Sequence, residues 1–227
     1  VFVDVMKELP ATLIMRPFNF DTLAIRTYQL ASDEFLREAA GPGLAIVLTV
    51  LTALMLQVIF EFGPLWLVAS GTGAGLYGPF WAGLVSTLGL GGLLAGRVRL
   101  DRPVTLTATI TVLTLASWAL TVSRNLLVVT IAQFAVALVV VMVGIYVSRV
   151  LHDAVPSTVR SGVVSGVGAL SWITFLPVSL VFGQVSKHHG VETAAWMITA
   201  VALVASAVLV KLAALQKQKR AQIEVSH

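Results

Sequence analysis

The chain has 227 residues, of which 57% are apolar and only 11% are charged, and its mean hydropathy is +0.92. A soluble domain carries about 25% charged residues, because its folded surface must be wetted by water. These values exclude an ordinary soluble enzyme, a disordered chain and a coiled coil. The absence of cysteine excludes a disulfide scaffold and a thiolate metal site. The sequence therefore predicts an integral membrane protein.

Residues 1–43 form a charged N-terminal extension that differs from the rest of the chain. Acidic and basic side chains occur throughout it, and residues 1–14 are mainly apolar with charges inside the run. That run is too short to span a bilayer, and it lacks the basic start and the cleavage site of a secretory signal. We expect a short helical extension before the first membrane span.

Six apolar segments follow this extension. A helix that crosses about 30 Å of hydrocarbon needs roughly 20 mainly apolar residues. Lipid offers no partner to an open backbone, and the runs 135–143 and 200–210 lack the alternation of a membrane β-strand. The predicted fold class is therefore an all-α integral membrane protein with a six-transmembrane-helix bundle. The predicted spans are residues 44–69, 76–95, 104–122, 126–148, 162–185 and 193–212.

Basic residues in the short loops predict the orientation of the bundle, because such residues favour the cytoplasmic side. The opposite loops hold only Arg124 and Lys187. We expect a multi-pass protein of the cell (inner) membrane, with both ends of the bundle cytoplasmic from residue 44 onward. Residues 213–227 are predicted to be a cytoplasmic basic tail. The basic residues that follow the second, fourth and sixth spans are Arg97, Arg99, Arg102, Arg149, Arg160, Lys211, Lys217, Lys219 and Arg220.

Three runs carry a resemblance that extends over about residues 49–215. They read FEFGPLWL at 60–67, STLGLGGLLAGRVRLDRP at 86–103 and DAVPSTVRSGVVSGVG at 153–168. These runs resemble the C-terminal six-helix half of major facilitator superfamily transporters. The resemblance implies secondary transport of a small solute. It also implies a substrate cavity shared with a second six-helix unit, either a complementary half or another copy of the chain.

A different resemblance covers about the first 48 residues. The run VDVMKELPATLIMRPFNFDTLA at 3–24 and its continuation REAAGPGLAIVL at 37–48 are similar to the C-terminal end of ferric-iron-type ABC transporter permeases. In that family the last helix runs inward, whereas the facilitator family runs the corresponding helix outward. The basic loops favour the facilitator topology. We expect a permease tail joined to a facilitator half within residues 45–54. The alternatives are a permease subunit of a binding-protein-dependent ABC importer with an ATPase partner, or a fusion remnant that does not transport.

Glu61 is the candidate for proton coupling. It lies about two thirds along the first predicted span, with Gln57 one turn earlier on the same face. A carboxylate in hydrocarbon costs several kcal/mol, so such residues usually face a cavity or a partner. The functional hypothesis is a carboxylate that takes up and releases a proton as water reaches it. The alternative is a structural carboxylate, either near the outer water interface or paired with a neighbouring helix.

The loop after the second span is the second candidate. The facilitator resemblance implies a charge network at this place, in which a helix-end acid and the loop arginines hold one conformation. Gly96 stands where the family has an acid, so the network is incomplete, and a positive-inside anchor is the alternative. The residues of this loop motif are Gly92, Gly96, Arg97, Arg99, Asp101 and Arg102.

Glycines and prolines predict how the spans pack and bend. Gly92 with Gly96, and Gly162 with Gly166, are four residues apart and predict a close approach of helices. Prolines inside the spans predict bends, and bent helices often line the path of a transporter, although ordinary membrane packing explains these residues as well. The prolines concerned are Pro64, Pro79 and Pro177.

The sequence offers no set of residues for catalysis. His188 and His189 are adjacent in a loop and cannot close a metal site without other ligands, so they are predicted to be solvated. No phosphate-binding glycine loop with its following lysine occurs, and no Ser, His and Asp set is arranged for hydrolysis. We expect no enzymatic activity, no cofactor, no metal and no nucleic-acid partner. The expected partners are the lipid bilayer, a small solute and a second six-helix unit.

Overall fold

Long apolar runs satisfy their backbone polar groups by coiling into helices. The computed structural model describes residues 36–98, 100, 102–155 and 160–225, and its regular elements are all helical. They are α3 (Leu36–Phe62), α4 (Pro64–Ala69), the 3-10 helix η1 (Ala74–Leu76), α5 (Tyr77–Ala95), α6 (Pro103–Val122), α7 (Leu126–Ala154), α8 (Arg160–His189) and α9 (Val191–Val225). The expected helical extension over residues 1–35 lies outside the described residues.

Six of the described helical segments are long and apolar enough to cross a membrane, and this confirms the predicted all-α six-helix bundle. The last helix is longer than predicted. Residues 213–225, expected to form a tail, continue α9 without a break, because Ala, Leu, Gln and Lys are good helix formers. The spans are Ala40–Phe62, Ala74–Ala95, Pro103–Val122, Leu126–Ala154, Arg160–His189 and Val191–Gln218.

The first predicted span is divided at Gly63 into α3 and α4. Pro64 is the first residue of α4 and has no N–H to donate to the preceding turn. Gly63 still bonds back from its N–H to the carbonyl oxygen of Ile59 at 2.9 Å, so the two helices follow one another with a bend. The bend expected at Pro64 therefore coincides with a real helix boundary, whereas α8 continues through Pro177.

Local sequence also fixes the short turns between helices. Asn125 precedes α7, and its side-chain oxygen accepts hydrogen bonds from the N–H groups of Leu127 and Val128 at 3.0 and 3.3 Å. Gly190 separates α8 from α9 with a φ of 87°, a conformation that a residue with a Cβ rarely adopts. These two positions allow each helix pair to reverse direction within a few residues.

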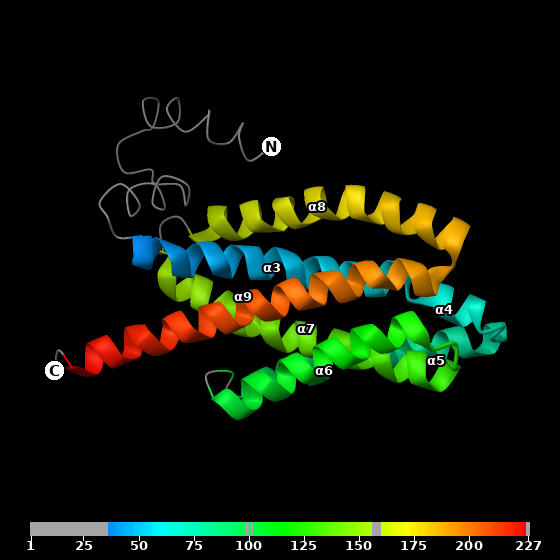
Figure 1. Ribbon diagram of the computed structural model, residues 1–227, viewed down its shortest axis with the longest axis horizontal. Coiled ribbons are helices and arrows are strands. Elements are labelled where there is room, and N and C mark those ends of the chain that lie inside the picture. Colours follow the sequence, from blue (N-terminus) through cyan, green and yellow to red (C-terminus); the bar gives the residue numbers. More distant parts are fainter. Residues whose placement is uncertain (1–35, 99, 101, 156–159, 226–227) are drawn as a thin grey trace, which may run out of the picture.

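The bundle has two ends with different loops (Figure 1). The start of α3, the end of α5, the start of α6, the end of α7, the start of α8 and the last turns of α9 lie at one end, which we call the Arg102 end. The turns at 70–73, 123–125 and Gly190 lie at the other, which we call the Arg124 end. The loops with most of the basic residues therefore share one end, as an even number of crossings between them requires.

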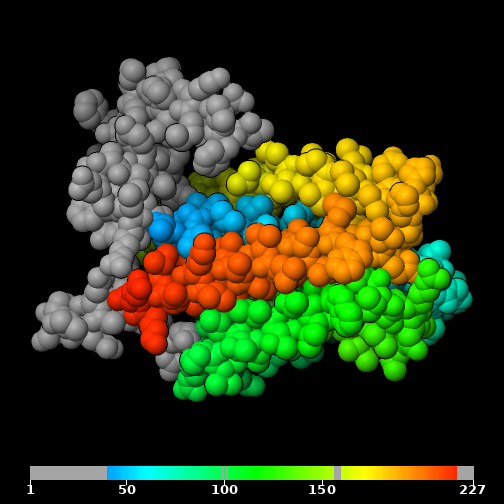
Figure 2. Space-filling view, viewed as in Figure 1, coloured from blue at the N-terminus to red at the C-terminus, as the bar shows by residue number. Residues whose placement is uncertain are grey.

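Helices α3 and α7 lie at the centre of the bundle. Helix α3 packs against α7, α8 and α9, whereas α7 packs against α3, α5 and α6. Helix α8 runs along one edge and α6 along the opposite edge, as Figure 2 shows from one side. Both central helices contribute to the buried apolar core, with Leu48, Met55 and Ile59 of α3 and Val136 and Val143 of α7 among its residues.

The packing pattern repeats within the chain. Helices α3, α5 and α6 can be matched in order with α7, α8 and α9. The contact between α5 and α7 then corresponds to the contact between α8 and α3, and the contact between α6 and α7 corresponds to that between α9 and α3. The α3–α7 and α6–α9 contacts map onto themselves. Within the described part of the chain, the α8–α9 contact has no counterpart of similar extent between α5 and α6. This correspondence relates α3, α5 and α6, which we call the first three-helix unit, to α7, α8 and α9, the second unit, whose helices run in the opposite direction (Figure 1).

Candidate functional site

Glu61 lies near the end of α3 and is exposed. Roughly 12 Å of helix separates it from Ala69 at the Arg124 end, if α3 and α4 are counted together. The neighbouring residue Gly63 lies against Gln133, which is itself about two turns inside α7. Glu61 is the penultimate residue of α3 and of the candidate span Ala40–Phe62, and its depth in a bilayer stays a prediction.

Aromatic pairs on both sides define the direction in which Glu61 points. Phe60 stacks edge-on against Trp81 of α5, with ring centroids 5.8 Å apart. Phe62 packs against Phe182 of α8 at 4.6 Å. Successive residues of a helix are about 100° apart, so Glu61 lies between these two directions. Glu61 thus occupies an open surface of α3 that is flanked by α5 and α8, which we call the α3–α5–α8 face.

Gln57 lies one turn before Glu61 and is partly buried. Its side-chain oxygen Oε1 is buried and accepts no hydrogen bond from any residue that the structure describes. Side chains four residues apart on a helix are neighbours. Gln57 therefore carries an acceptor without a donor among the described residues, one helical turn before the predicted proton-coupling carboxylate.

Several glycines of α5 and α8 lie on sides of these helices that no described residue covers. A Cβ added at Gly78, Gly89 or Gly92 of α5 would meet no atom within 4 Å, and the same holds for Gly162 and Gly166 of α8. No helix of the described chain packs against these glycines. Their predicted role in close helix packing stays a prediction, and it concerns a surface beyond this chain. Pro177 of α8 is also exposed.

The glycines that do bring helices together are different ones. A Cβ at Gly91 would lie 2.7 Å from Cγ1 of Val141, and one at Gly83 would lie 2.5 Å from the ring of Phe134. Both contacts join α5 to α7. Sequence analysis missed them because spacing alone does not show which side of a glycine-rich helix is covered.

Sequence analysis also missed Gln133, which is fully buried in α7. Its Nε2 donates to the carbonyl oxygen of Gly63 at 3.4 Å, whereas its Oε1 has no partner among the described residues. The available signal was an amide in the otherwise apolar middle of the fourth span. Trp66 supports the same bend from the other side, because its Nε1 donates to the carbonyl oxygen of Leu120 at 3.2 Å.

The structure describes some residues of the predicted loop motif at the Arg102 end. Arg97 and Arg102 are exposed, whereas Arg99 and Asp101 lie outside the described residues. Gly96 ends α5. Arg149 of α7, which was not part of the predicted motif, donates from Nη1 to the carbonyl oxygen of Ala95 at 3.4 Å. A cation at this position suits the negative end of the α5 dipole.

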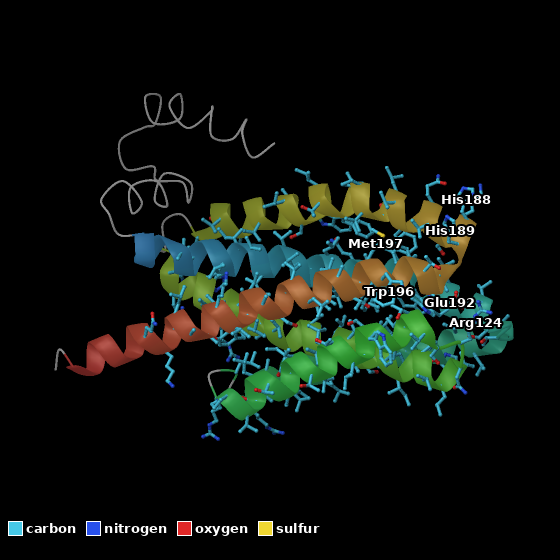
Figure 3. All side chains as sticks on the ribbon, viewed as in Figure 1. Arg124, His188, His189, Glu192, Trp196 and Met197 are labelled. Atoms are coloured by element: carbon cyan, nitrogen blue, oxygen red, sulfur yellow. The ribbon has the colours of Figure 1, made fainter. Side chains whose placement is uncertain are left out.

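The Arg124 end holds an ion pair between the α6–α7 turn and the start of α9 (Figure 3). Nε of Arg124, before α7, lies 2.8 Å from Oε1 of Glu192, at the start of α9. The Arg124 side chain is 83% exposed and that of Glu192 is 18% exposed. His188 and His189 are exposed at the end of α8. Among the described residues no three His, Asp or Glu side chains are grouped so as to hold a metal.

The fold and these sites define a multi-pass membrane protein with six membrane-spanning helices. Comparisons of the chain with protein-family models, with curated proteins and with solved structures found no match.

Proposed function

We propose that the chain is one half of a secondary transporter of the major facilitator type, which moves a small solute by alternating access between two six-helix units. The observation that carries this proposal is the exposed carboxylate of Glu61 within the apolar candidate span Ala40–Phe62. A carboxylate in contact with lipid costs several kcal/mol, whereas water or a polar partner surface removes that cost. The α3–α5–α8 face is therefore assigned to a water-accessible cavity or to a partner.

The repeated packing pattern supports the same proposal. Each six-helix half of a major facilitator transporter contains two inverted three-helix repeats, and the substrate site lies near the bilayer midplane between the halves. The contacts of α3, α5 and α6 correspond to those of α7, α8 and α9 in this way. Glu61 lies between Phe60, which contacts α5, and Phe62, which contacts α8, and these are the second helices of the two units.

The second six-helix unit is either a complementary half or another copy of the chain. A substrate at the midplane needs walls from both units, and a rocking motion needs a second body. The isolated monomer is therefore proposed to be inactive, with no enzymatic activity of its own. The alternative of an ABC importer subunit depends on about the first 48 residues, most of which lie outside the described residues.

Cysteine cross-linking in native membranes tests this assignment, because the chain itself has no cysteine. Gly89→Cys and Gly166→Cys place thiols on the open sides of α5 and α8, and we expect each to cross-link to a second six-helix unit. Leu115→Cys lies on the exposed side of α6, away from this face, and serves as the control that is not cross-linked. Cross-linking at Leu115 alone, or at none of the three positions, would contradict the proposal.

A further inference from the structure

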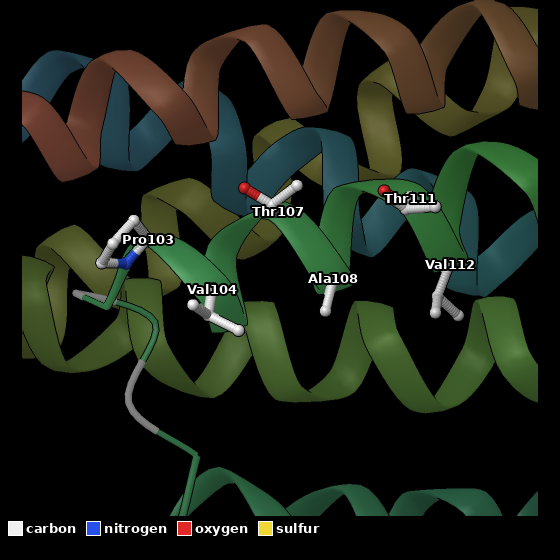
Figure 4. Close-up of a pocket in the computed structure, with 6 residues that line it drawn as sticks. All are labelled: Pro103, Val104, Thr107, Ala108, Thr111 and Val112. Carbon is white, nitrogen blue, oxygen red and sulfur yellow. The ribbon is translucent and has the colours of Figure 1, made fainter.

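The outer side of α6 carries a groove that the proposed transport function does not use. Helix α6 packs against α7 and α9 through a buried side that includes Thr109, Leu113 and Ser117. Its opposite side is exposed, and a shallow, wide-open groove of about 630 Å³, lined by residues of α6 alone, runs along it. Figure 4 shows the residues that line it, which are Pro103, Val104, Thr107, Ala108, Thr111 and Val112.

The length of the groove matches one leaflet of a bilayer. From Pro103 to Val112 the axis of α6 rises by roughly 14 Å. Half of a hydrocarbon core of about 30 Å is about 15 Å. The groove begins at the first residue of α6, where the helix leaves the Arg102 end. It therefore extends from the surface of one leaflet to about the middle of the bilayer.

The lining of the groove suits a hydrocarbon chain. Pro103, Val104, Ala108 and Val112 present only carbon atoms in their side chains, and Val104 is 78% exposed. Only the two threonines add hydroxyl groups. Covering these apolar side chains with the methylene groups of an acyl chain is more favourable than exposing them to water.

The charge beside the groove lies at one end only. Arg102 directly precedes Pro103, and Arg97 lies in the same short loop, both of them exposed. Neither guanidinium group takes part in a hydrogen bond or ion pair with any residue that the structure describes. Arg149 and Arg124, by contrast, are engaged with Ala95 and Glu192. A free guanidinium presents a planar set of N–H donors that fits a phosphate group.

We propose that this groove and its two arginines form a binding site for an anionic phospholipid of the leaflet at the Arg102 end. The acyl chain lies along α6 from Pro103 to Val112, and the phosphate group contacts Arg102 and Arg97. A phospholipid is favoured over a partner helix for two reasons. The groove is as long as one leaflet, which matches an acyl chain, and it has positive charge at one end, which matches a phosphate headgroup. A free phosphate ion would leave the apolar groove uncovered. The site does not depend on whether the chain transports a solute.

Lipid competition followed by native mass spectrometry tests the site. The purified full chain in detergent is mixed with equal amounts of phosphatidylglycerol and phosphatidylcholine that carry the same acyl chains. We expect the wild-type chain to retain phosphatidylglycerol preferentially. Neutralising one arginine near an anionic headgroup lowers affinity by about fivefold, so Arg102→Gln should reduce the preference by about this factor. Adding Arg97→Gln should reduce it further.

Control variants separate the groove from general charge effects. Lys187→Gln removes an exposed charge at the Arg124 end and should leave the preference unchanged. Ala108→Phe fills the groove and should lower retention of both lipids, whereas Val164→Phe makes a similar addition on exposed α8 and should not. Soluble glycerol phosphate should fail to displace the lipid. Equal retention of both lipids by the wild type, an unchanged preference in Arg102→Gln, or equal losses in Lys187→Gln would overturn the proposal.

Discussion

The amide of Gln133, buried in α7, donates a hydrogen bond to the carbonyl oxygen of Gly63 at the point where α3 gives way to α4. Pro64 has no N–H to donate to the preceding turn, and the Gly63 carbonyl beside it accepts from the N–H of Trp66 at 3.3 Å as well as from Gln133. The bend lies two residues after Glu61. Gln133 therefore helps to fix the position of the α3 backbone next to the candidate carboxylate.

Gly63→Ala should destabilise the bundle. The added Cβ would meet the carbonyl oxygen of Ile59 and would lie 2.6 Å from Oε1 of Gln133, so either the bend or the amide must move. We expect a loss of about 1–3 kcal/mol in the free energy of unfolding, as is typical of overpacked sites. Equilibrium unfolding in detergent micelles measures this loss. The matched control is Gly89→Ala, where a Cβ meets open space, and equal stability of the two variants would contradict the account.

Two adjacent glycines of α5 should respond in opposite ways to alanine. At Gly91 a Cβ would lie 2.7 Å from Cγ1 of Val141 and 3.4 Å from the carbonyl oxygen of Leu138, so Gly91→Ala should separate α5 from α7. We expect a cost of about 1–3 kcal/mol. At Gly92 nothing lies within 4 Å, and Gly92→Ala should stabilise α5 by about 0.5–1 kcal/mol through helix propensity. Thermal unfolding measures the stability of both variants. If Gly92→Ala were less stable than Gly91→Ala, the result would show that α5 is rotated about its axis.

Hydropathy predicted the number and type of the helices because a span in lipid has only one way to satisfy its backbone. It did not predict which sides of those helices are covered. Gly91 and Gly92 differ by one residue, or about 100° around α5, and only Gly91 contacts α7. Gln133 and Gln57 are both amides in apolar spans, yet only Gln133 reaches a backbone carbonyl. Such distinctions depend on the packing of distant segments, which a single sequence does not contain.

The candidate site divides in the same way. Pro64 indicated the helix boundary near Glu61, whereas the depth of Glu61 in the bilayer stays a prediction. The open surroundings of Glu61 depend instead on Phe60 and Phe62, which stack on α5 and α8 respectively. No spacing rule indicated that these two aromatic side chains turn toward different helices.

Cysteine labelling should show that the Arg102 end is cytoplasmic. The chain has no cysteine of its own, so single thiols can be introduced without background. We expect Arg99→Cys and Arg160→Cys to be shielded from impermeant thiol reagents added outside intact cells, because basic loops favour the cytoplasmic side. His188→Cys, at the Arg124 end, should be labelled. Labelling at position 99 from outside would reverse the predicted orientation.

Transport should require a second six-helix unit and the titrating proton of Glu61. The purified monomer should show no proton-driven accumulation of solute in vesicles, whereas co-expression with a complementary half should restore it. In the restored system, Glu61→Gln should abolish the dependence on the proton gradient, because glutamine keeps the size and the hydrogen bonding of the side chain without its titrating group. Uptake measured across a series of imposed pH gradients tests this. An unchanged pH profile would make Glu61 structural.

The most direct test of the central claim is the accessibility of a spin label at Glu61→Cys in lipid bilayers. If the α3–α5–α8 face borders water, the label should collide with a water-soluble relaxation agent more often than a lipid-facing label does. If the face contacts a partner, the label should be less mobile than a lipid-facing label. Leu115→Cys, 57% exposed as Leu115 on the outer side of α6, supplies the lipid-facing reference. If the label at position 61 is mobile and accessible only to oxygen, as at position 115, then Glu61 faces lipid and the proposed half-transporter is contradicted.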